Sequence, residues 1–290
     1  MSTHRITRRT WLKTVPGAMG VAALSSPLHA QQYQIAGADL KLGVASYSFR
    51  RFSRAQAIEM TKQLGTPYLN VKEFHLKLDS TPQQIDAAVK EFHAAGIILV
   101  GCGNVSFQKD DESDIRHKFE YAKRAGFPLI VCAPTAVTLP KLEKFVREYD
   151  IKIAVHNHGP EDKNFPTPQS VLKIVKNMDP RCGLCIDLGH TAAAGVDVVQ
   201  SIADAGPRLL DMHAKDLREI SSAETQVPVG DGKLPIPKIF HQLISMKYNG
   251  CVNLEYEADP DNPMPAMQKS FSYMRGVLAR MQSADHGDTR

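Results

Sequence analysis

The 290-residue sequence lacks any apolar run approaching the roughly 18 residues of a membrane-spanning helix. It also lacks a G-x-G-x-x-G segment after its first apolar run, the main signal of a doubly wound dinucleotide-binding sheet. Beyond its first 30 residues, the sequence also lacks net charge. Four of the 35 lysines and arginines, and no acid, lie in the first 30 residues, so 31 basic residues face 31 acidic ones in the remainder. A neutral domain has no overall basic field, and we expect no nucleic-acid partner.

The five cysteines do not form a pattern that suits a disulfide framework or a zinc cage. Four of them fall inside apolar runs, and Cys182 begins one. Cys182 and Cys185 form a C-x-x-C pair, but on an extended strand that spacing covers about 10 Å and places the side chains on opposite faces. This exceeds disulfide reach, and there is no second pair for a zinc cage. We therefore expect buried, unpaired thiols.

Residues 1–30 resemble a twin-arginine export signal. Arg8 and Arg9 are followed by an apolar pair and Lys13, then by a weakly apolar stretch and a small-residue cleavage site ending at Ala30. The resemblance implies a signal peptide over residues 1–30 and one catalytic domain over residues 31–290. It further implies an exported or periplasmic protein with no membrane attachment after removal of the signal.

From residue 40 onward, short apolar runs alternate with amphipathic stretches of helical length. The runs are 42–47, 67–74, 97–102, 127–133, 151–155, 182–186, 209–213 and 251–255. Runs apolar on both faces are typical of buried parallel strands. Helices are expected between them, for example over 81–95, 112–125 and 167–178. Eight such units in about 250 residues predict an α/β fold, a (β/α)8 TIM barrel, with an open doubly wound sheet as the alternative.

Two stretches depart from this alternation. Residues 216–234 form a long insertion after the seventh run, and residues 259–265 form a loop rich in proline and aspartate after the eighth. Both would lie at the carboxyl-end mouth of the barrel, where active sites are built, so either is a candidate lid.

Ionisable residues gather where several predicted strands end. The segments are 72–75, 156–161, 187–190, 213–216 and 253–257. In a barrel these ends meet at one mouth. Grouped carboxylates repel one another unless a cation lies among them. Carboxylates with an imidazole suit a borderline divalent ion, so the sequence predicts one metal ion, Mn²⁺, Co²⁺ or Zn²⁺.

These motifs resemble the xylose isomerase-like barrel superfamily, which includes sugar phosphate isomerases and epimerases. The resemblance rests on Asp-x-Gly-His after the sixth run, His-x-Lys-Asp after the seventh, Gly-x-Val-x-x-Glu at the eighth and His-Asn-His at the fifth, and it spans about residues 40–280. It implies metal ligands from the fifth to eighth strands, at Glu161, Asp187, His213 and Glu255. Because Glu161 lies beyond the predicted strand end, His156 or His158 are alternatives at that place.

The resemblance also implies roles around the metal. Glu161 and Glu255 would move protons, with His158 as a further catalytic candidate. Residues expected to bind substrate are His75, His156, His190 and Lys215, although Lys215 could equally pair with Asp187 or Asp216. Tyr47 and Arg50 are candidates to shape the pocket. Phe49, Phe74 and Phe107 are candidates for its apolar wall, with core packing as the alternative for each.

The expected function is a metal-dependent sugar isomerase or epimerase acting through an enediolate on a small free sugar or keto-sugar. A base would remove the proton beside the carbonyl, and an acid would return it elsewhere or expel a leaving group. The alternative is a carbon–oxygen lyase or hydratase acting on 3-keto-glycosides or related keto-sugars. A nuclease and a non-catalytic sugar-binding protein fit the neutral charge and the intact ligand set less well. A homo-oligomer is compatible with the sequence, which does not fix the oligomeric state.

Overall fold

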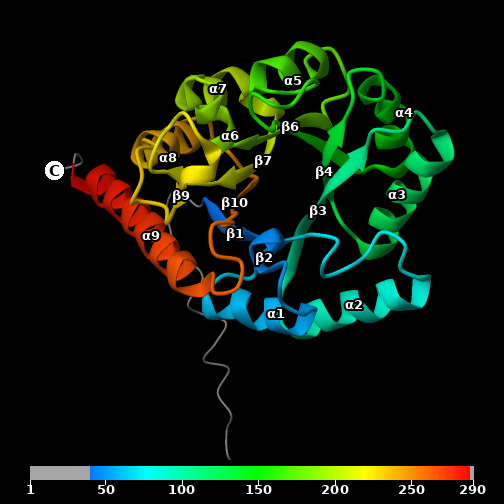
Figure 1. Cartoon of the computed structure of the whole chain (residues 1–290), viewed down its shortest axis with the longest axis horizontal. Coiled ribbons are helices and arrows are strands. Elements are labelled where there is room, and N and C mark those ends of the chain that lie inside the picture. Colours follow the sequence, from blue (N-terminus) through cyan, green and yellow to red (C-terminus); the bar gives the residue numbers. More distant parts are fainter. Residues whose placement is uncertain (1–39, 288–290) are drawn as a thin grey trace, which may run out of the picture. The chain divides into compact units, whose positions relative to one another are not determined.

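A computed structural model describes residues 40–287. Eight parallel strands close into a barrel that is ringed by helices (Figure 1). The predicted (β/α)8 fold is therefore confirmed. The predicted signal peptide over residues 1–30 lies outside the described residues. Within the described residues, no helix is long and apolar enough to cross a membrane.

The barrel strands follow chain order around the ring until the last strand, β10, closes on β1. They are β1 (Lys41–Ala45), β2 (Tyr68–Val71), β3 (Ile98–Phe107), β4 (Leu129–Pro134), β5 (Lys152–His156), β6 (Cys182–Asp187), β7 (Leu209–Ala214) and β10 (Cys251–Leu254). Every residue of β6 and β10 is buried, which explains why these strands read as continuous apolar runs.

Helices cover the outside of the barrel. They are α1 (Arg54–Gln63), α2 (Pro82–Ala94), α3 (Glu112–Ala125), α4 (Leu139–Tyr149), α5 (Pro168–Val175), α6 (Leu188–Ala193), α7 (Val198–Ala205), α8 (Ile236–Ser245) and α9 (Met264–Gly287). Side chains cap several starts: Ser53, Thr81 and Thr167 each form a capping box. Gly126 ends α3 with a left-handed φ of 72°. The capping boxes fix where these three helices begin, and Gly126 fixes where the chain leaves α3 for the next strand.

The predicted insertion after the seventh strand forms a small two-stranded antiparallel sheet of β8 (Asp216–Leu217) and β9 (Gln226–Val227). Asp216 secures it. Its Oδ1 accepts the backbone N–H groups of Leu217 and Leu234 at 2.9 and 3.0 Å, and its Oδ2 accepts those of Gly230 and Gly232 at 2.9 and 3.1 Å. The insertion is thus tied to the end of the barrel wall by one buried carboxylate.

The described residues also form three short 3-10 helices: η1 (Ser46–Phe49), η2 (Gly206–Arg208) and η3 (Ala223–Thr225). All five cysteines are free and buried, as predicted. Burial raises the pKa of the Cys102, Cys132, Cys182, Cys185 and Cys251 thiols. These thiols are therefore part of the packed interior and are not in their reactive thiolate form.

Candidate metal and active site

Four buried side chains from four adjacent strands meet at the mouth of the barrel. His156 ends β5, Asp187 ends β6, His213 lies in β7 and Glu255 follows β10. His156 Nε2 lies 2.9 Å from His213 Nδ1 and 3.4 Å from Asp187 Oδ2, while His213 Nδ1 lies 3.0 Å from Glu255 Oε2. One ligand atom from each residue lies within 4.8 Å of all the others. We call this set the four-residue cluster.

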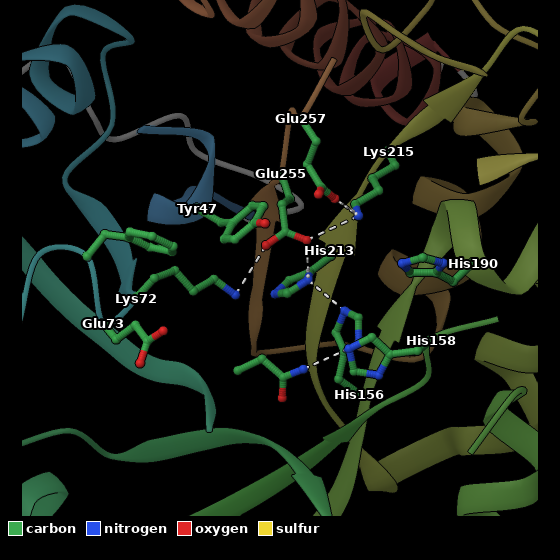
Figure 2. A pocket seen from close by; sticks show the side chains of 12 residues that line it. Tyr47, Lys72, Glu73, His156, His158, His190, His213, Lys215, Glu255 and Glu257 are labelled. Atoms are coloured by element: carbon green, nitrogen blue, oxygen red, sulfur yellow. Dashed lines mark hydrogen bonds and ion pairs between the residues drawn. The ribbon is translucent and has the colours of Figure 1, made fainter. Parts of the chain in front are cut away.

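Two lysines lie against the carboxylates of the cluster. Lys215 Nζ is 3.0 Å from Asp187 Oδ2 and 3.2 Å from Glu255 Oε2, and it also pairs with Glu257. Lys72 Nζ is 3.2 Å from Glu255 Oε1. Figure 2 shows these contacts converging on Glu255 from both sides. The site therefore already places cationic groups beside its buried acids.

The charges set the protonation of the cluster. Burial alone would raise the pKa of Asp187, but Lys215, His190 and His156 hold it well below its usual value. Glu255 behaves alike: burial raises its pKa, and the opposing charges of His213, Lys72 and Lys215 lower it well below the ordinary range. Burial lowers the pKa of His156. The cluster thus holds ionised carboxylates and a neutral imidazole, the states in which these groups bind metals.

An unsatisfied carboxylate oxygen in the cluster fits a divalent metal ion. Asp187 Oδ2 is buried and has no hydrogen-bond partner among the described residues. His156 Nδ1 and His213 Nε2 also lack partners there, but they are not the ring nitrogens that meet within the cluster. Asp187 Oδ2 faces the Lys215 ammonium at 3.0 Å without accepting a hydrogen bond from it. Buried polar atoms without partners are uncommon, and two imidazoles with two carboxylates form a ligand set for a borderline divalent ion.

A cavity of about 400 Å³ opens above the cluster. Imidazoles form one side of it: His158 and His190 lie beside His156, with ring centroids of His158 and His190 5.9 Å apart. In Figure 2 Tyr47, Lys72 and Glu73 lie on the side opposite these imidazoles. The cavity is of a size that suits a small ligand.

His158 is held between two polar partners. The Asn104 amide Nδ2 donates to His158 Nε2 at 2.8 Å, and His158 Nδ1 lies 3.5 Å from Asp162 Oδ2. Because an amide nitrogen only donates, Nε2 carries the lone pair and Nδ1 carries the proton that faces Asp162. Burial lowers the pKa of His158. This is the arrangement of an imidazole base oriented by a carboxylate.

The structure brings most of the expected site residues together and separates two. Asp187, His213 and Glu255 meet as expected, and His156, His158, His190 and Lys215 line the same cavity. Lys215 pairs with Asp187, the first of its two expected partners, and not with Asp216.

The structure places Glu161, an expected metal ligand, outside the four-residue cluster. The chain turns at Gly159, whose φ is 85° and whose Cα packs against His190, so that Glu161 lies exposed on the turn beyond. From β5 it is His156 that faces the cluster, one of the two alternatives at this place. A glycine in the left-handed region lets the backbone leave the strand direction sharply.

His75 also falls outside the main cavity. It is buried, with Nδ1 2.9 Å from Ser46 Oγ and Nε2 3.2 Å from the Phe49 carbonyl oxygen. Both ring nitrogens are used to fix the turn after β1, so the expected role in binding substrate here is not supported. Of the three candidate wall residues, Phe49 and Phe107 are fully buried and Phe74 is 48% exposed.

The sequence analysis included Lys72 in the ionisable segment 72–75 without giving it a role, and it missed Asn104. Lys72 directly follows β2. Asn104 lies inside β3, where the pairing with β4 shifts register between Cys102 and Val105. This local backbone path requires glycine at position 103, since a Cβ there would lie 2.0 Å from the Val131 carbonyl oxygen. Nothing in the apolar pattern indicates such a bulge.

The family model described as xylose isomerase-like TIM barrel matches residues 113–277. The chain belongs to this family. The matched residues include all four members of the four-residue cluster, His156, Asp187, His213 and Glu255. The predicted family and fold are thereby confirmed.

Similar proteins include dehydratases and epimerases. An inosose dehydratase of Lactiplantibacillus plantarum is 27% identical over 150 residues, which are 45% of this chain and 49% of that protein. The chain thus matches about half the length of this curated relative. The crystal structure of a D-tagatose 3-epimerase-like protein has a TM-score of 0.67 at 18% identity, covering 84% of this chain and 99% of the other. That of the probable 3-DHS dehydratase AsbF of Bacillus anthracis has a TM-score of 0.65 at 12% identity, covering 81% and 99%. At such identities the structures show a shared fold.

Proposed function

We propose that this protein is a metal-dependent carbon–oxygen lyase that acts on a small, unphosphorylated keto-sugar. The observation that carries the proposal is the position of His158, which lies between the Asn104 amide and the Asp162 carboxylate and lines the same cavity as His190. It offers a base and a second imidazole on the same side of the cavity. The dehydratase name of the relative matched over half its length adds support.

A divalent ion held by His156, Asp187, His213 and Glu255 would make the hydrogen beside the substrate carbonyl more acidic. We propose Mn²⁺, Co²⁺ or Zn²⁺ because the set mixes imidazoles with carboxylates. Lys215, whose pKa Asp187, Glu255 and Glu257 raise against the effect of burial, stays charged and stabilises negative charge that develops on the substrate.

His158 acts as the general base. Its Nε2 lone pair points at the Asn104 amide, 2.8 Å away, and this amide occupies the place that a substrate hydrogen would take. When His158 accepts the proton, the imidazolium is stabilised by Asp162 behind it. Asn104 is then free to donate to a substrate oxygen.

His190 acts as the general acid. The C–H bond breaks toward His158, its electron pair forms the carbon–carbon double bond, and the C–O bond on the neighbouring carbon breaks. The leaving oxygen takes a proton from His190. The two rings lie 5.9 Å apart in the lining of the same cavity, and this proximity supports the proposal that they serve as base and acid for neighbouring carbons of one substrate. Exchange with solvent then removes the proton from His158 and returns one to His190.

Isomerisation or epimerisation is the second candidate, favoured by one observation. Glu73 lines the cavity across from His158 in Figure 2, and a proton moved between the two faces of one carbon needs groups on both sides. Another observation favours the lyase. Of the two glutamates expected to move protons, Glu161 and Glu255, only Glu255 lies in the cluster, and it is paired with Lys72 and Lys215.

Export through the predicted signal peptide over residues 1–30 is part of the proposal. Its support is the twin-arginine sequence at Arg8 and Arg9. An exported enzyme would meet free sugars and glycosides and not sugar phosphates.

Proton NMR and mass spectrometry in D₂O test the proposal. Metal-loaded protein is offered a panel of free ketoses and 3-keto-glycosides. Loss of water or of an alcohol, with a new carbon–carbon double bond in the product, is the expected result. Deuterium entering beside the carbonyl with the skeleton otherwise intact would instead identify an isomerase or epimerase. No exchange and no loss with any compound would contradict both.

A further inference from the structure

A second hollow of about 550 Å³ lies beside the main cavity, and one side chain borders both. Phe74, in the loop between β2 and α2, lines the main cavity on one side and the hollow on the other. No other residue is shared by the linings of the two. Phe74 therefore forms the boundary that a ligand extending from the main cavity would cross.

Phe74 is exposed but held in place. Its side chain is 48% exposed, and it is the one aromatic among the four exposed large apolar residues of the described chain. The Tyr47 ring meets it edge to face, with centroids 5.6 Å apart and an interplanar angle of 69°. Arg50 stacks over Tyr47 at 4.6 Å and donates to the Glu257 carbonyl oxygen at 2.9 Å. A braced, half-exposed ring at the mouth is a surface on which an apolar ring face can stack.

The rest of the lining of the hollow is mostly polar. It includes Asp79, Ser80, Gln84 and Lys77, together with Arg54 and His75. Carboxylate, hydroxyl, amide and ammonium groups recognise the hydroxyl groups of a sugar ring, whereas they would leave a purely apolar ligand unsatisfied. An aromatic face on one side and mixed hydrogen-bonding groups on the other fit a hexose.

We infer that this hollow binds the second sugar ring of a keto-disaccharide whose keto-sugar ring lies in the main cavity. The inference rests on the proposed function and makes it more specific: the oxygen that leaves is the glycosidic oxygen, and the leaving group is the alcohol form of the second sugar. Phe74 stacks on that ring and determines the preference for two-ring over one-ring substrates.

Calorimetric binding to the metal-loaded protein tests this. The probes are methyl 3-keto-β-D-glucopyranoside, with one ring, and cellobiose oxidised at C3 of its non-reducing ring, with two. We expect the two-ring compound to bind about fivefold more tightly, the scale of one aromatic contact. Phe74→Ala should reduce this ratio to less than about twofold, and Phe74→Trp should retain the ratio.

Ile98→Ala is the matched control, since Ile98 is 49% exposed but begins β3 at the opposite end of the barrel. It should leave the ratio unchanged. Equal binding of the two probes by the native protein, a preference that survives Phe74→Ala, or binding of neither probe would overturn the inference. Turnover is measured separately: a two-ring preference with no product would contradict the proposed lyase and leave this binding site standing.

Discussion

Two buried aspartates near the barrel mouth, Asp187 and Asp216, are satisfied in different ways. Each is at most 1% exposed. Asp216 accepts four backbone N–H groups within 3.1 Å. Asp187 accepts one, from His190 at 2.8 Å, and its other oxygen lies 3.0 Å from Lys215 Nζ and 3.4 Å from His156 Nε2 without accepting a hydrogen bond. The first carboxylate has completed its bonds within the fold, while the second retains an oxygen for a ligand.

The difference indicates a structural role for Asp216 and a ligand-binding role for Asp187 at the same end of the barrel. A carboxylate saturated by backbone donors stabilises the loop that supplies them. A buried carboxylate left with an unpaired oxygen among two imidazoles costs stability in the free protein and recovers it when a cation binds. Burial is alike at the two sites, and what distinguishes them is hydrogen-bond satisfaction together with the lysine and imidazoles beside Asp187.

The largest effect should come from the satisfied aspartate. Asp216→Ala leaves four N–H groups without an acceptor and should lower the free energy of unfolding by more than about 3 kcal/mol in a urea titration. Asp231→Ala is the control in the same insertion, because Asp231 forms a surface ion pair with Lys269. That variant should lose less than about 1 kcal/mol. Equal losses in the two variants would remove the structural role of Asp216.

The next effect concerns activity. His158→Gln removes the proposed base and should lower kcat/KM by about 100-fold with little change in unfolding free energy. Asp162→Asn should lower it less and change its dependence on pH, since Asp162 orients His158 without touching substrate. Glu161→Gln should stay near the native value because Glu161 is exposed on its turn. If the Glu161 variant lost activity and the His158 variant kept it, the assignment of the base would be wrong.

A smaller effect is expected at the unsatisfied aspartate. In metal-free protein, Asp187→Asn keeps an oxygen for the His190 N–H and leaves Lys215 paired with Glu255 and Glu257. It should change the unfolding free energy by less than about 1 kcal/mol. Urea titrations in the presence of a chelator measure this. A loss as large as that of Asp216→Ala would erase the contrast between the two aspartates.

The last prediction concerns the pH dependence of stability. Burial lowers the pKa of both His75 and His156 below the ordinary value of 6.5. The unfolded chain therefore takes up protons that the folded chain refuses, and the stability of metal-free protein should fall as pH drops from about 6.5 to 5, by at most about 1.4 kcal/mol per pH unit for each histidine. His75→Gln should flatten this slope and the exposed control His241→Gln should not. A slope unchanged by His75→Gln would show that His75 titrates alike in both states.

Much of the fold could be predicted because burial leaves a direct trace in the sequence. The range of α3, residues 112–125, was predicted in full, because Asp111 caps its start and Gly126 its end. The predicted strands differ from the observed ones by at most five residues at either end, and those beginning at Cys182, Leu209 and Cys251 start where predicted. The largest difference is in β3, which continues to Phe107 past the bulge at Gly103.

The site could be predicted in part. Asp187, His213 and Glu255 stand at strand ends, where barrel topology brings side chains together regardless of detail. Glu161 was misplaced because its position depends on one backbone turn at Gly159, and His75 because its bonds to Ser46 and Phe49 are local. The signal peptide over residues 1–30, the export and the oligomeric state stay predictions.

Calorimetric titration of divalent metal into chelator-treated protein tests the central claim most directly. With Mn²⁺, Co²⁺ or Zn²⁺, at least one ion should bind with one equivalent per chain. Asp187→Asn should weaken that binding by about 100-fold or more, and Glu161→Gln should leave it unchanged. Absence of binding by the native protein, or loss of binding in Glu161→Gln with retention in Asp187→Asn, would contradict the account.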